Sequence, residues 1–177
     1  MKSFIALTVI AAVTACSPVK IVSIDKADDF SLASYKTFDF VDVDVSGADS
    51  PSFSDRVEWI KDEISRQLSQ KGLTQTSTSP ELLLNIGVVV EEKEQTRETT
   101  LMDAPRYMGQ RNYHWESQDV VVNHYKQGTV TVDFVDSKTN SRVCEAVASA
   151  VVVKNDATAK KNIARGVEQV LEKISGV

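Results

Sequence analysis

The sequence predicts an α+β domain in which two helices pack on one face of a largely antiparallel β-sheet. Two segments, 54–71 and 156–174, space their apolar residues three and four positions apart, which indicates amphipathic helices. Several other segments alternate apolar and polar residues with the period of two that is typical of strands. The order of strands, helix, strands and helix favours one two-layer domain, and the chain is long enough to bury one core.

The first strand is expected at 19–24 and the second at 35–41, where aromatic rings alternate with polar side chains. Residues 42–53 contain Gly47 and Pro51, which are typical of turns, and this segment is expected to form a loop.

The helix predicted at 54–71 has one apolar stripe and clear end signals. Ser54 can serve as the N-cap, Asp55 complements the positive helix start, and Gly72 is a suitable stop. The apolar stripe consists of Val57, Ile60, Ile64 and Leu68.

A buried strand is predicted at 82–90, with a polar extension at 91–100 and a loop at 101–115. Three strands are then expected at 119–125, 129–135 and 142–153, the last two joined by a hairpin turn at 136–141. The helix at 156–174, capped by Asp156 or Thr158, closes the domain.

The first residues of the chain have the features of a bacterial lipoprotein signal. Lys2 gives a positive start, and 4–13 is an apolar run that is too short for a membrane span of about 20 residues. Residues 13–16 match the lipobox pattern, which is a branched apolar residue, two small residues and then a cysteine. A cleaved lipoprotein signal peptide is therefore expected to precede the domain.

This signal divides the chain into a signal peptide at 1–15, a lipidated tether at 16–18 and a single α+β domain at 19–177. Cys16 is the expected site of acylation, with palmitate as a typical chain, and the membrane is thus the first expected partner. Ser17 follows the cysteine where an aspartate would favour the inner membrane, so we expect an outer-membrane anchor facing the periplasm.

With a formal net charge of −5, the sequence shows no electrostatic footprint for nucleic acid, so no nucleic-acid partner is expected. Attachment to the membrane therefore depends on the lipid, since an acidic domain is not attracted to anionic headgroups. If Cys16 is lipidated, Cys144 has no partner for an intramolecular disulfide. Cys144 shares one strand face with Ala146 and Ala148, which favours a small buried hydrophobe over a reactive thiol.

Four short segments carry a resemblance to a known family: DFSLASYKTF at 29–38, LSQKGL at 68–73, SPELLL at 79–84 and GTVTVDFVD at 128–136. In this order and spacing they resemble a family of bacterial lipoproteins called domain of unknown function 4136. The resemblance extends over 20–174. It implies a small lipoprotein domain that faces the periplasm, and it implies no catalytic residues.

No arrangement of residues in the sequence predicts catalysis. No serine lies in a Gly-x-Ser-x-Gly motif, and the glycines are scattered singly rather than forming a phosphate-binding loop. His114 and His124 lack the ligand spacing of a zinc site, and the acids of 39–44 are expected to line the solvent face of a strand. The sequence therefore predicts a protein that is not an enzyme and has no cofactor and no metal.

One segment, 105–115, concentrates the residue types that are enriched at protein interfaces. The candidate partner-binding residues are Arg106, Tyr107, Arg111, Tyr113 and Trp115. The alternative interpretation is a long loop over one end of the sheet, with Tyr113 and Trp115 buried.

Three functions remain as hypotheses, and the oligomeric state stays open. The leading one is a non-catalytic lipoprotein that binds an envelope protein or supports assembly. The second is a carrier of a small apolar ligand between helices and sheet, which requires a cavity and is disfavoured by tight packing there. The third is a hydrolase, which requires a cleft that gathers His114 or His124 with an acid and a nucleophile.

Overall fold

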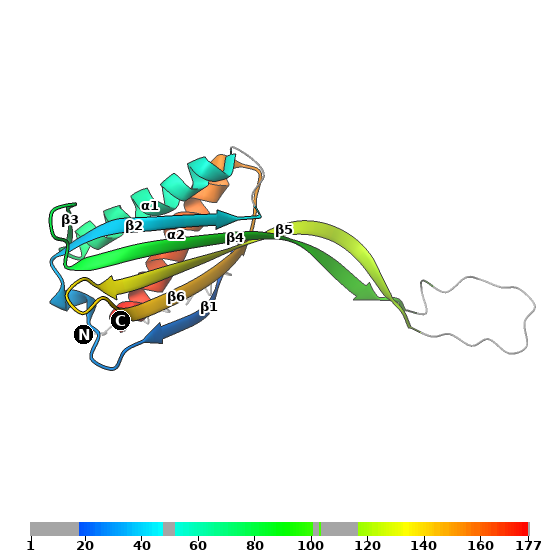
Figure 1. Ribbon diagram of the computed structural model, residues 1–177. Coiled ribbons are helices and arrows are strands. Elements are labelled where there is room, and N and C mark those ends of the chain that lie inside the picture. The colour runs from blue at the N-terminus through cyan, green and yellow to red at the C-terminus, as the bar shows by residue number, and fades with distance from the viewer. Residues whose placement is uncertain (1–17, 48–51, 101–102, 104–116, 177) are drawn as a thin grey trace, which may run out of the picture.

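The computed structural model describes residues 18–47, 52–100, 103 and 117–176, which form one six-stranded sheet with two helices on one of its faces (Figure 1). The elements are β1 Val19–Lys26, β2 Thr37–Ser46, α1 Ser52–Gln70, β3 Thr74–Gln75, β4 Leu82–Glu98, β5 Asp119–Asp136, β6 Ser141–Val151 and α2 Asp156–Ser175. This architecture confirms the predicted α+β fold.

The strand order in the sheet is β1-β6-β5-β4-β2-β3. The pairs β1–β6, β6–β5 and β5–β4 are antiparallel, whereas β2 pairs with β3 and β4 in parallel. A parallel pair needs a crossover connection, and α1 lies in the connection between β2 and β4. The sheet is thus mostly antiparallel, with a parallel part beside α1.

The core lies between the helices and the facing side of the sheet. The predicted stripe of α1 is buried, and every second side chain of β4 from Leu82 to Val90 is buried as well. Gln67 joins the helices, since its Nε2 donates to the carbonyl of Ala164 in α2 at 3.0 Å. The helices therefore cover the sheet as one layer.

The predicted end of α1 is confirmed. Gly72 has a φ of +94°, a left-handed conformation that favours glycine. The N–H of Leu73 donates to the carbonyl of Leu68 and that of Gly72 to the carbonyl of Ser69, each at 3.0 Å. These two bonds form a Schellman motif, which satisfies carbonyls at the helix end.

The helix starts differ from the sequence prediction. Because α1 begins at Ser52, Ser54 lies inside its first turn and is not the N-cap. The N-cap of α2 is Asn155, whose Oδ1 accepts a hydrogen bond from the N–H of Thr158 at 2.9 Å, and not Asp156 or Thr158. Several polar residues in a row can each serve as a cap, and the backbone conformation selects one of them.

The loop predicted at 42–53 and the break between two later strands were wrong. β2 continues to Ser46 because its second half pairs in parallel with β4 as far as Val89, and it ends at Gly47 with a φ of +70°. β5 is continuous because Gly128, at the expected break, pairs with Val90 on one side and Ala150 on the other. In both cases pairing between distant segments overrides the local turn signal.

The outer parts of β4 and β5 form a two-stranded ribbon that extends away from the body (Figure 1). Residues 91–98 pair with 119–127, whereas the pairing of β2 ends at Val89 and that of β6 at Gln127. We call residues 91–98 and 119–126 the projecting arm. Eight residues of strand span about 26 Å at roughly 3.3 Å per residue.

Within the described part of the chain, neither helix combines the length and apolar character needed to cross a membrane.

Candidate functional site

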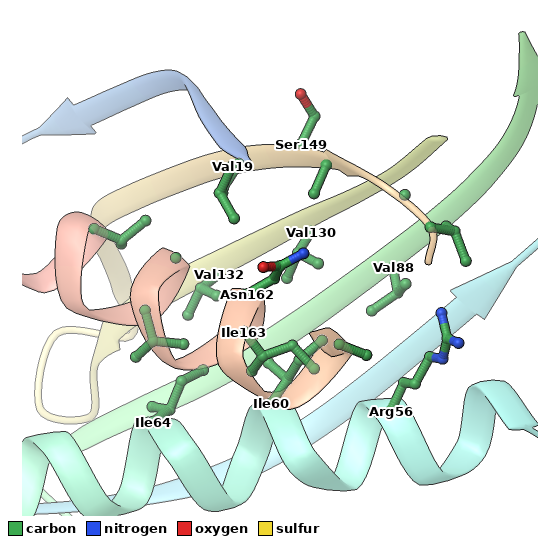
Figure 2. Close-up of a pocket in the computed structure, with 18 of the residues that line it drawn as sticks. Val19, Arg56, Ile60, Ile64, Val88, Val130, Val132, Ser149, Asn162 and Ile163 are labelled. Atoms are coloured by element: carbon green, nitrogen blue, oxygen red, sulfur yellow. The ribbon is translucent and has the colours of Figure 1, made fainter. Parts of the chain in front are cut away.

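An apolar cavity of about 170 Å³ lies between the two helices and the sheet (Figure 2). Its walls include Val88, Val130 and Val132 from the sheet, Ile60 and Ile64 from α1, and Ile163 from α2. An engineered apolar cavity of about 150 Å³ in another protein stays dry and binds benzene. The cavity is therefore of the size that holds a small apolar molecule.

Small side chains explain why the space between α2 and the sheet is not filled. The strand β6 presents Ala146 and Ala148 to the helices, and α2 makes few close contacts with β6 although it packs closely on α1 and β1. Gly166 permits the approach to β1, since a Cβ there would lie 3.2 Å from Cγ1 of Val19. The helix thus bridges from β1 to α1 and leaves a void above β6.

Three polar side chains border this apolar space. Figure 2 shows the amide of Asn162 directed into the cavity, whereas the hydroxyl of Ser149 points away from the other lining side chains. Arg56 lies at one end of the cavity beside Val88, with its guanidinium directed from α1 toward the sheet (Figure 2). The cavity therefore has one charged end and one inward-directed amide in a lining that is otherwise mostly apolar.

The guanidinium of Arg56 makes one hydrogen bond and one ring contact, but its Nε–H group lacks an acceptor among the described residues. Its Nη2 donates to the carbonyl of Val153 at 2.5 Å, and its Cζ lies 5.6 Å from the centroid of the Phe53 ring. Its Nε is buried and has no hydrogen-bond acceptor among the described residues. A buried donor without a partner costs about 1–3 kcal/mol, so an acceptor at this place would stabilise it.

Cys144 is buried as predicted and lies outside the cavity lining. Its side chain is 1% exposed, and no described cysteine is within reach for a disulfide. Burial raises the pKa of the thiol to about 11 because it disfavours the charged thiolate, and the charge of Lys26 opposes this only in part. A reactive thiol has a lowered pKa, so the environment is that of a structural cysteine.

The histidines and acids singled out in the sequence do not converge. His124 lies on the projecting arm, where its Nδ1 is 3.6 Å from Oε1 of Glu94, and its side chain is 72% exposed. His114 lies outside the described residues, and Asp42 and Asp44 are exposed on β2. In the part of the chain that the structure describes, no three metal-ligating side chains come together.

The candidate partner-binding residues Arg106, Tyr107, Arg111, Tyr113 and Trp115 also lie outside the described residues, in the connection between β4 and β5. Asp103, which is a described residue of that connection, forms an ion pair with Arg97 of the projecting arm. Arg97 donates to both carboxylate oxygens of Asp103 at 2.7 Å, and this interaction holds the pKa of the Asp103 carboxyl well below its usual range.

The fold and the cavity define a small two-layer α+β domain with an apolar space between its layers. Residues 22–174 match the family described as "Domain of unknown function (DUF4136)", so the chain belongs to this family. No curated protein matches the sequence.

A solved structure with a similar fold is that of a PDZ domain protein from Parabacteroides distasonis ATCC 8503, with a TM-score of 0.50 and 16% sequence identity. The similarity covers 86% of this chain but only 35% of that protein, and at this identity it shows the fold alone. A PelC dodecamer from Paraburkholderia phytofirmans gives a TM-score of 0.47 at 11% identity, over 86% of this chain and 96% of that one.

Proposed function

We propose that this protein is a lipid-anchored, non-catalytic lipoprotein of the cell envelope whose domain holds a small apolar ligand between its helices and its sheet. The observation that carries this proposal is the apolar cavity of about 170 Å³. Most of its lining comes from aliphatic side chains of both helices and of the sheet, which is the lining expected for an apolar ligand.

The proposed anchor, Cys16, is close in sequence to Val19, one of the residues that line the cavity. Val19 begins β1 and lines the cavity, and only three residue steps separate it from Cys16. Three steps span at most about 11 Å, so an acylated Cys16 would hold the cavity near the membrane surface. A membrane is a source of apolar ligands. Ser17 favours the outer membrane, with the domain facing the periplasm.

Methyl NMR with benzene as the probe tests the ligand site. Benzene should shift the methyl signals of Val130, Val132 and Ile163, which line the cavity, and leave that of Leu84, which is fully buried elsewhere. In Ala148→Ile, which adds three carbon atoms to the cavity wall, the shifts should be lost. Unchanged signals in the native chain, or equal shifts in the filled variant, would contradict the proposal.

Incorporation of radiolabelled palmitate in intact bacterial cells tests the anchor. The native chain should be labelled and Cys16→Ser should not, because the proposed acylation requires the thiol of Cys16. Cys144→Ser is the matched control and should keep its label, since Cys144 is buried. Equal labelling of the native chain and Cys16→Ser would refute the lipid anchor independently of the cavity.

The projecting arm supports a second candidate function, which is binding of an envelope protein. A two-stranded ribbon is marginally stable in water on its own, so contact with a partner would stabilise it. Across the arm, Lys126 pairs with Glu92 at 3.8 Å, which helps to keep the ribbon soluble and in register.

Crosslinking in intact cells tests this second function. The double variant Tyr107→Ala with Arg111→Ala should lose crosslinked envelope complexes while its thermal unfolding stays unchanged. Complexes that persist unchanged in the double variant would rule out this part of the chain as the binding site.

A further inference from the structure

We infer that the ligand of the cavity is an amphiphile with one aliphatic chain and an anionic end, whose anion binds the guanidinium of Arg56. This inference rests on the proposed function and adds the chemical class of the ligand. The chain would occupy the apolar space between α2 and the sheet, and the anion would lie at the end of the cavity that Arg56 borders (Figure 2).

The hydrogen-bonding state of Arg56 is the first argument. A guanidinium has five N–H donors, and in Arg56 the described structure gives one bond, from Nη2 to the carbonyl of Val153. The buried Nε has no acceptor among the described residues. A carboxylate or a phosphate offers two oxygens in the geometry that a guanidinium binds best.

The second argument is charge. Three other arginines of the described chain, Arg66, Arg97 and Arg142, each pair with an aspartate or glutamate. Arg56 has no carboxylate within ion-pair distance among the described residues, although its side chain is only partly exposed. A half-buried cation at the end of an apolar cavity therefore complements an anion that a ligand brings with it.

The charge of Arg56 itself, and not that of its neighbours, selects the sign of the ligand's charge. Its contact with the Phe53 ring fixes the planar group without neutralising it. Asn162 is directed into the cavity, but an amide both donates and accepts and so does not distinguish an anion from a cation. The selection for a negative end thus falls to Arg56.

The size of the cavity limits the apolar part. A volume of about 170 Å³ is close to that of a cavity that holds one benzene ring, so a single chain of medium length fits better than a pair of long chains. Two sources have this chemistry, namely a free fatty acid and an anionic phospholipid that places part of one chain in the cavity.

Equilibrium dialysis with the full-length protein in lipid nanodiscs tests the inference, with empty nanodiscs as the blank. Octanoate, octanol and octylammonium have the same chain and differ in the charge of their end. Octanoate should bind about tenfold or more tightly than octanol, and octylammonium should bind least. Replacing zwitterionic by anionic lipid distinguishes the sources, because a phospholipid in the cavity would reduce octanoate binding.

Substitutions of Arg56 test whether its charge causes the preference for octanoate. Arg56→Gln should lower octanoate affinity to that of octanol, whereas Arg56→Lys, which keeps the charge, should still prefer octanoate. Lys61→Gln is the matched control, since it removes a cation of α1 that does not line the cavity. It should leave the affinities for octanoate and octanol unchanged. Thermal unfolding of each variant verifies that it is folded. If Arg56→Gln does not fold, the comparison of octanoate, octanol and octylammonium on the native chain still tests the inference.

The two proposals fail in different ways. If none of the three probes binds, or if the cavity-filling variant Ala148→Ile binds them all, the proposed ligand function is wrong. If octanoate, octanol and octylammonium bind equally, or if Arg56→Gln and Arg56→Lys both keep the native preference for octanoate, the ligand function stands. In that case the assignment of Arg56 to an anion is overturned.

Discussion

Filling the cavity at Ala148 should stabilise the protein, which is opposite in sign to most core substitutions. Ala148 is half-buried on β6, lines the cavity and lies opposite Val130 of β5. Replacement by isoleucine adds three carbon atoms, and burial of each methylene contributes about 0.8 kcal/mol. Complete filling would therefore contribute about 2.4 kcal/mol. Because a new side chain rarely fits without strain, we expect about 1–2 kcal/mol.

Thermal unfolding followed by circular dichroism measures this effect. A gain of 1–2 kcal/mol should raise the Tm by about 3–6 °C for a domain of this size. The control is Cys144→Ile, at a position on the same strand that is 1% exposed and does not line the cavity. Overpacking of a filled core costs about 1–3 kcal/mol, so the Tm of this control should fall.

The comparison of the two variants makes the test decisive. Both introduce isoleucine into β6, so the strand preference of this residue contributes to both and does not explain a difference. If the Tm of Ala148→Ile falls as far as that of Cys144→Ile, the space beside Ala148 is already filled. The cavity and the ligand function built on it would then both be refuted.

Three further predictions concern stability and titration. Asn155→Ala should lower the free energy of unfolding in urea by about 1 kcal/mol through loss of the cap on the Thr158 N–H, whereas Asn155→Asp should keep it. The pKa of Cys144 is raised from 9.0 to about 11, so its contribution to the free energy of unfolding is complete below pH 9 and is lost as the pH rises to about 11. The free energy of unfolding of Cys144→Ala should therefore fall less over this pH range than that of the native chain. Burial and the hydrogen bond from its hydroxyl to Asp136 raise the pKa of Tyr35 from 10.0 to about 12, so an ultraviolet titration should lose its latest tyrosine step in Tyr35→Phe.

The sequence by itself determined the two helices and the segments that form most of the strands. Their signals are local, since apolar spacing within one segment depends on nothing that lies far along the chain. The segments that resemble the family also contain fully buried residues, among them Phe38, Leu68, Leu82 and Phe134. The family and the fold class were therefore predictable from residues whose main role is packing.

The exact strands depended on partners that the sequence does not reveal. Residues 42–46 alternate polar side chains with valines, but Gly47 and Pro51 follow closely and give the region a turn signal; the parallel pairing with β4 carries the strand to Ser46. Gly128 interrupts the apolar pattern of β5 but is held in the ladder by neighbours on both sides. Local propensity is weak compared with the hydrogen bonds of a complete ladder, so tertiary pairing decided these boundaries.

For the candidate site, too, the sequence determined some features and the tertiary structure determined the others. The sequence indicates that Ala146 and Ala148 share one face of a strand, and two helices over a sheet make a ligand between them conceivable. A void, however, is the difference between the space that the backbone encloses and the side chains that fill it, and no local pattern records it. Arg56 is likewise an ordinary helical cation in the sequence. Only the packing of α1, α2 and the sheet places its guanidinium at the end of an apolar cavity without a carboxylate partner among the described residues.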